Sequence, residues 1–108
     1  MTVKELLENK MFSAVVLPEP DRVIEGVYIG DLLSWVMGNA NSGDAWITIM
    51  SNVNILAVAT LTDCACIILS EGVAVDETIC NTALEKGINI IVSPASSYEV
   101  AVELSRAL

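Results

Sequence analysis

Short apolar runs alternate along the chain with segments whose apolar residues recur at helical spacing. The runs that predict strands lie at residues 12–17, 26–29, 45–50, 65–69 and 88–92. They are nearly continuous in apolar residues rather than alternating with polar ones. Such strands are expected where helices cover both faces of a parallel sheet.

The segments between these runs predict helices at residues 2–9, 32–37, 55–61, 76–86 and 96–108. Two of these helices begin with the form of a capping box, which is Thr2 with Glu5 and Ser96 with Glu99. Asp31 is placed to cap the second helix. These signals predict where the helices begin.

The alternation of strand and helix predicts an α/β fold of three layers, a mostly parallel sheet with helices on both faces. A length of 108 residues falls in the range of one domain and is enough to bury one core. No internal repeat, linker or low-complexity tract divides the chain. We therefore expect a single domain over residues 1–108.

The composition indicates more apolar surface than a single domain core would bury. Hydrophobic residues make up 54% of the chain, which is more than one small core requires. Pairing of two copies is the usual way for a short chain to cover such surface, so we expect a homodimer. The predicted interface is the second helix with a nearby tryptophan, through Leu33, Trp35, Val36, Met37 and Trp46.

Charge limits the partners. The net charge is −9, and the few basic residues are scattered along the chain. Nucleic acids and anionic membranes are therefore poor partners. No apolar run approaches the ~20 residues of a membrane helix, and no signal peptide is evident, so a cytoplasmic location is expected.

The residue types exclude several kinds of chemistry. The chain has no histidine, which removes Ser/His and Cys/His nucleophile pairs and imidazole metal ligands. Neither a dinucleotide-binding nor a P-loop glycine motif occurs. Cys64 and Cys66 would share one face of a strand, but with Cys80 they supply only three of the four ligands of a zinc site. Reduced, buried thiols are the favoured interpretation, and no metal or cofactor is expected.

Ligands of open α/β sheets bind at the carboxyl ends of the strands, where this chain has three polar loops. The candidate ligand-binding residues in these loops are Ser51, Asn52, Asn54, Gly72, Ser93, Ser96 and Ser97. Helix capping is the favoured role of Ser51, Asn54 and Ser96, with ligand contact as the alternative. Glu71, Asp76 and Glu77 would oppose a phosphate at the middle loop.

Three segments together resemble the DRTGG domain: residues 26–34 (GVYIGDLLS), 46–49 (WITI) and 54–59 (NILAVA). The similarity extends from about Leu17 to the end of the chain. The resemblance implies the fold of the N-terminal domain of HPr kinase/phosphorylase, which is similar, and an accessory, often dimer-forming module that also occurs fused to phosphotransacetylases and to paired CBS domains. The chain departs from the family at residues 70–75 (SEGVAV), where a turn of the T-G-G-x-x-P kind is often found.

Three functions follow as hypotheses. The leading one is a non-catalytic regulatory or scaffolding module, homodimeric, that senses a small metabolite or nucleotide. The second is an interaction subunit that docks a larger enzyme or a signalling protein, with redox metabolism suggested by the reduced thiols, and binds no small ligand. The third, disfavoured, is an enzyme that uses carboxylates alone, for which Asp31 and Asp44 sit at element boundaries but are equally explained as a cap and a turn.

Overall fold

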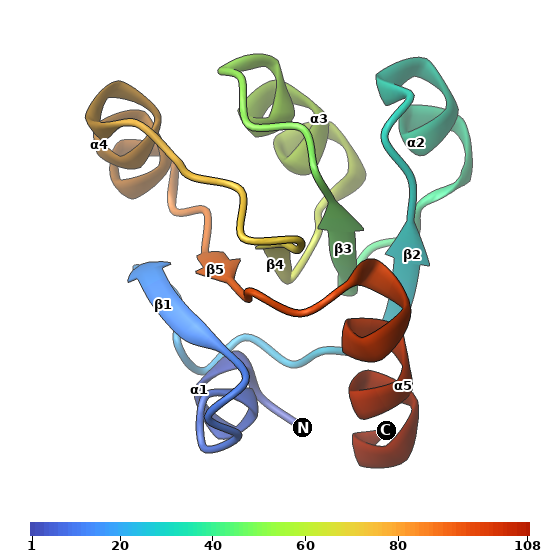
Figure 1. Ribbon diagram of the computed structural model, residues 1–108. Helices are drawn as coiled ribbons and strands as arrows, with labels where there is room; N and C mark the ends of the chain where they lie inside the picture. The colour runs from blue at the N-terminus through green and yellow to red at the C-terminus, as the bar shows by residue number, and fades with distance from the viewer.

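Five strands form one mixed sheet in the order β1-β5-β4-β3-β2 (Figure 1). The computed structural model describes all of residues 1–108. Strands β2 to β5 are parallel to one another, and β1 pairs antiparallel with β5. The strands are β1 (Ser13–Val16), β2 (Gly26–Ile29), β3 (Asp44–Thr48), β4 (Cys66–Leu69) and β5 (Ile90–Val92).

Helices cover both faces of this sheet (Figure 1). One face carries α2 (Leu33–Asn39), α3 (Asn54–Thr62) and α4 (Glu77–Lys86), and the other carries α1 (Val3–Leu6) and α5 (Ser97–Ala107). The predicted three-layer α/β fold with a mostly parallel sheet is confirmed. None of the helices has the length and apolar character needed to cross a membrane.

The two cores are built by alternate residues of the same strands. In β4, Ile67 and Leu69 point to the core beneath α2, α3 and α4, whereas Cys66 and Ile68 point to the core beneath α1 and α5. All of β4 is buried, and so is all of β3. The continuous apolar runs of the sequence are therefore explained by burial on both faces.

Two capping boxes form as expected, at Thr2 with Glu5 and at Ser96 with Glu99. The predicted cap at Asp31 is wrong. Leu32 is the N-cap of α2 and makes no side-chain cap, while the Asp31 carboxylate accepts hydrogen bonds from Thr48 Oγ1 at 2.8 Å and the Ile49 backbone N–H at 2.9 Å. Asp31 thus ties the loop after β2 to the end of β3.

The expected caps of α3 are also corrected. Val53 is the N-cap of this helix and has no side-chain cap, so neither Ser51 nor Asn54 has that role. The side chain of Asn52 instead accepts a hydrogen bond from the Asn54 backbone N–H at 2.9 Å. This is a local Asx turn, which shapes the loop ahead of the helix.

The two tryptophans allow a direct test of the core. Trp46 is completely buried and donates from Nε1 to the Gly30 carbonyl at 2.9 Å, whereas Trp35 is 64% exposed. Trp46→Phe leaves that carbonyl without its partner and should lower the free energy of unfolding by about 2 kcal/mol. Trp35→Phe is the matched control and should change it by less than about 0.5 kcal/mol. Urea unfolding of both variants measures the difference, and equal effects would contradict this assignment of the core.

Candidate functional site

At the carboxyl edge of the sheet, two of the three predicted ligand loops are joined to each other. The Gly72 backbone N–H donates to the Ser93 carbonyl at 3.0 Å, and Ser70 Oγ lies 2.6 Å from Ser97 Oγ. Glu71 adds a backbone bond from its N–H to the Ala95 carbonyl at 2.8 Å. These bonds bind the loop after β4 to the loop after β5.

The third predicted loop, residues 51–54, makes only local hydrogen bonds. Ser93 is buried and its hydroxyl accepts from the Ala95 N–H, while Ser96 is occupied by its capping box. The polar groups predicted to meet a ligand are thus largely bonded within the protein. None of the seven predicted residues lines either of the two cavities of the structure, so their contact with a ligand stays a prediction.

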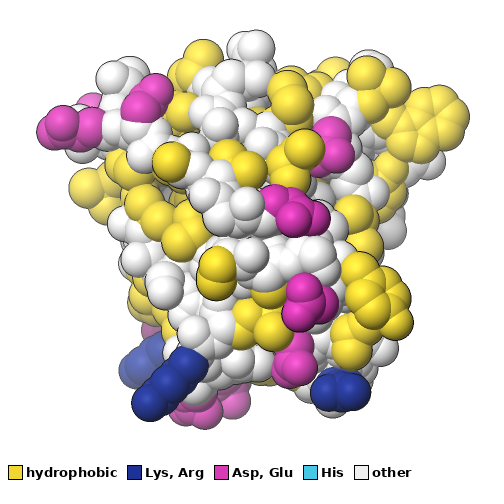
Figure 2. All heavy atoms as spheres, viewed as in Figure 1, with side chains coloured by type: hydrophobic (Ala, Val, Ile, Leu, Met, Phe, Trp, Pro, Cys, Tyr) yellow, Lys and Arg dark blue, Asp and Glu magenta, His cyan; other side chains and the backbone are white.

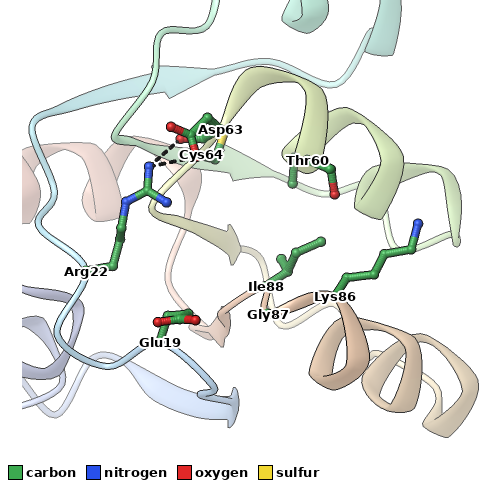
Figure 3. A pocket seen from close by; sticks show the side chains of 9 residues that line it. Glu19, Arg22, Thr60, Asp63, Cys64, Lys86, Gly87 and Ile88 are labelled. Carbon is green, nitrogen blue, oxygen red and sulfur yellow. Dashed lines mark hydrogen bonds and ion pairs between the residues drawn. The ribbon is translucent and has the colours of Figure 1, made fainter.

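The larger cavity lies at the opposite, amino edge of the sheet and has a volume of about 360 Å³. It opens between the carboxyl ends of α3 and α4 and the segment that connects β1 to β2 (Figure 3). Its lining residues are Glu19, Arg22, Ala59, Thr60, Asp63, Cys64, Lys86, Gly87 and Ile88. The volume falls in the lower part of the range of small-molecule sites.

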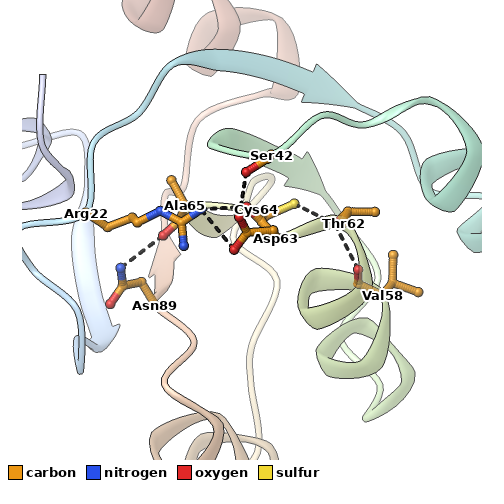
Figure 4. A network of polar contacts seen from close by, with 8 residues as sticks. All are labelled: Arg22, Ser42, Val58, Thr62, Asp63, Cys64, Ala65 and Asn89. Atoms are coloured by element: carbon orange, nitrogen blue, oxygen red, sulfur yellow. Dashed lines mark hydrogen bonds and ion pairs between the residues drawn. The ribbon is translucent and has the colours of Figure 1, made fainter.

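One wall of this cavity is held by an ion pair between Arg22 and Asp63. Arg22 Nη2 lies 3.0 Å from Asp63 Oδ1 and donates to the Asp63 backbone carbonyl at 2.7 Å, and the Ser42 hydroxyl donates to the other carboxylate oxygen (Figure 4). The Ser42 hydrogen bond first, and then Arg22, lower the pKa of Asp63 below its usual value. Asp63 is therefore an ionised structural partner and not a proton donor.

The backbone of Glu19, which lines the cavity, is held by a buried amide. Asn89 is 2% exposed; its Oδ1 accepts from the Glu19 N–H at 2.9 Å, and its Nδ2 donates to the Glu19 carbonyl at 2.8 Å and the Ala65 carbonyl at 3.0 Å. The amide thus fixes the backbone of Glu19 against the sheet. It leaves the Glu19 side chain free beside Gly87, whose left-handed conformation (φ 72°) ends α4.

The cysteines do not share one face as predicted. Strand β4 begins only at Cys66, so the alternation does not extend to Cys64, which packs on the α3 side while Cys66 packs on the α5 side. Burial raises the pKa of both thiols. All three cysteines are free, and no group of side chains is arranged to hold a metal.

Two carboxylates, those of Glu19 and Asp63, line this cavity. General acid–base catalysis needs a carboxyl whose pKa is close to the working pH, and that of Asp63 is lowered. The two carboxylates considered from the sequence are elsewhere: Asp31 holds the end of β3, and the buried Asp44 accepts from the Asn41 N–H at 2.8 Å in a turn. The arrangement supports binding more readily than acid–base chemistry.

The predicted dimer surface is partly corrected. Val36 and Trp46 are completely buried in the core under α2 and cannot meet a second copy. Trp35 and Met37 are exposed and Leu33 is half-buried. Other exposed apolar side chains are Ile29 and Leu32, just before α2, and Ile49 and Val53, in the segment between β3 and α3. Figure 2 shows hydrophobic side chains gathered over α2 at the upper right.

Sequence reasoning missed the cavity and the residues that build it. Asn89 offered a signal, as the single polar residue within the apolar run of residues 88–92. Arg22 and Lys86 gave none, because they lie far apart in the chain and only the tertiary fold brings them to one cavity.

Comparison with known proteins gives one family and one fold. The model of the DRTGG domain matches residues 13–107. This match begins earlier in the chain than Leu17, the start expected from the sequence. Among solved structures, the CBS and DRTGG domains of the regulatory region of Clostridium perfringens pyrophosphatase, complexed with its activator diadenosine tetraphosphate, match with a TM-score of 0.71 and 17% identity. The match covers 93% of this chain and 44% of that one, so this chain spans less than half of that region. No curated protein matches.

If Asn89 anchors the backbone of Glu19, replacing this one side chain should lower the stability of the protein markedly. Asn89→Ala removes three hydrogen bonds to the backbone of Glu19 and Ala65 and should lower the free energy of unfolding by about 2 kcal/mol. Asn81→Ala, on the exposed surface of α4, is the control and should change it by less than about 0.5 kcal/mol. Denaturant unfolding at neutral pH compares them; a near-neutral Asn89→Ala would show that the amide is not an anchor.

The ion pair predicts a pH-dependent effect. Because the pKa of Asp63 is lowered in the folded state, its contribution is present above the usual pKa of an aspartate and is lost as the pH falls through the folded-state value. Asp63→Asn, which tolerates the left-handed backbone there (φ 56°), should destabilise by up to about 1 kcal/mol at pH 7. The difference from wild type should shrink towards pH 2. Asp21→Asn, which removes a carboxylate with no side-chain hydrogen bond or ion pair, should show no such trend.

Proposed function

Because the chain belongs to the DRTGG domain family, we propose that it is a non-catalytic regulatory or scaffolding module that acts as a homodimer and responds to a small metabolite. The structural match to the regulatory region of a pyrophosphatase supports a regulatory role. The observation that carries the dimer is a surface, described next, that combines exposed apolar side chains with few ionised groups.

Charge is distributed very unevenly along the chain. From residue 32 to residue 62 the sole charged residue is Asp44, which is buried, although the whole chain has a net charge of −9. This stretch includes α2, β3 and α3 and exposes Leu32, Trp35, Met37 and Leu61. We call the exposed apolar side chains of α2 and of the segment after β3, Leu32, Trp35, Met37, Ile49 and Val53, the neutral face. Asp31, whose carboxylate bonds to Thr48 and Ile49, is the ionised residue at its border.

A second copy of the chain is the partner that suits the neutral face best. Two molecules of charge −9 repel each other at most surfaces, and a face with few ionised groups lets them approach closely. In a twofold dimer this same face would serve both subunits. Large aromatic side chains such as Trp35 commonly contribute most of the binding energy at the centre of such interfaces.

The experiment is the mass of the protein in solution, measured by sedimentation equilibrium across a range of concentrations. Wild type should be a dimer, and Trp35→Glu should weaken dimerisation at least 30-fold because it buries a carboxylate in the interface. Tyr98→Glu is the matched control: it places the same charge on an exposed aromatic position of α5, on the opposite face of the sheet, and should remain dimeric.

A wild-type monomer at every concentration would refute the homodimer. The neutral face would then be assigned to a larger partner protein, as in the second hypothesis drawn from the sequence. If Trp35→Glu and Tyr98→Glu weakened dimerisation equally, the neutral face would not be the interface. Either the interface would lie elsewhere, or added negative charge alone would weaken association.

A further inference from the structure

The cavity at the amino edge of the sheet contains two charges of opposite sign that the protein leaves unpaired. Glu19 and Lys86 both line it, and neither side chain forms a hydrogen bond or ion pair within the protein. The other two charged groups of the lining, Arg22 and Asp63, neutralise each other by direct contact. What remains for a ligand is one free carboxylate and one free ammonium group.

These two groups come from different parts of the fold. Figure 3 shows Glu19 on the segment before β2 and Lys86 near the end of α4, on opposite sides of the opening. The rest of the lining includes the apolar side chains of Ala59 and Ile88 and the polar side chain of Thr60. A dipolar molecule can therefore span the cavity with its charged ends on Glu19 and Lys86 and an apolar part between them.

The backbone around the cavity favours a cationic group on the ligand. The carboxyl ends of α3 and α4 both reach the lining, at Asp63 and Gly87, and a helix carboxyl end carries partial negative charge. Added to the Glu19 carboxylate, this field disfavours a purely anionic ligand. Lys86 then selects a carboxylate at the far end of the same molecule.

We infer that this cavity is a binding site for a zwitterionic metabolite of the size of an amino acid or dipeptide, with its ammonium group on Glu19 and its carboxylate on Lys86. The volume of about 360 Å³ accommodates such a molecule. The inference deepens the proposed regulatory function, on which its biological meaning rests, by naming the ligand class. It places the ligand at the edge of the sheet opposite to the polar loops.

Cys64 provides a built-in reporter of occupancy. It is half-buried in the lining of the cavity, whereas Cys66 is fully buried and Cys80 lies outside the lining on α4. A ligand in the cavity should slow alkylation of Cys64 and leave that of Cys80 unchanged. Peptide mass spectrometry after timed treatment with iodoacetamide at pH 8.5 separates the three sites.

The test uses a panel of free amino acids and dipeptides as probes, with their N-acetyl and methyl-ester derivatives and inorganic phosphate. We expect at least one zwitterion to raise the melting temperature and to protect Cys64, with blocked derivatives at least tenfold weaker. Glu19→Gln should weaken the zwitterion about tenfold but not its N-acetyl form, and Lys86→Met should weaken it about tenfold but not its ester. Glu85→Gln and Lys10→Met, which change the same charges outside the cavity, should bind as wild type does.

The inference is overturned if no zwitterion alters either readout, if phosphate binds and zwitterions do not, or if binding survives both Glu19→Gln and Lys86→Met unchanged. Running the panel on Trp35→Glu as well separates this inference from the dimer. Ligand binding by a wild-type protein that is monomeric at every concentration would refute the homodimer but keep the site, and a wild-type dimer without protection of Cys64 would do the reverse.

Discussion

Burial of the central strands on both faces is the constraint on which the rest of this structure depends. Strands β3 and β4 expose no residue to solvent, so helices must cover the sheet from both sides. The parallel strands β2 to β5 are added in one direction across the sheet. Since connections between parallel strands share one hand, α2, α3 and α4 all fall on the same face. The other face can be covered only by segments outside this run, which are α1 and α5.

This arrangement determines where the two candidate surfaces lie. The loop after β5 leads to the face opposite to the one reached by the loop after β4, and the two loops are joined by backbone and hydroxyl hydrogen bonds. The carboxyl edge is thereby closed with the protein's own groups. At the amino edge, the segment between β1 and β2 passes the ends of α3 and α4 without filling the space, and the cavity forms there.

The neutral face and the cavity differ in their content of ionised residues. Stretches without ionised residues supply α2 and α3, while two of the five basic residues, Arg22 and Lys86, line one cavity. Repulsion among the acidic groups elsewhere favours contact between copies at the neutral face. The cavity, on the amino edge of the sheet, keeps its two free charges available for a ligand. Association and ligand binding can therefore be measured separately in the same protein.

The sequence by itself determined the order and type of every helix and strand, because apolar periodicity and capping signals are local properties of the chain. It also indicated the family through residues 26–34, 46–49 and 54–59. The tertiary structure alone decided that Trp46 and Val36 are core residues, that Asp31 bonds to β3 and that Cys64 and Cys66 face different cores. It also decided where the cavity lies. Contacts of this kind join residues distant in sequence, and their geometry depends on the packing of the layers, which no local pattern encodes.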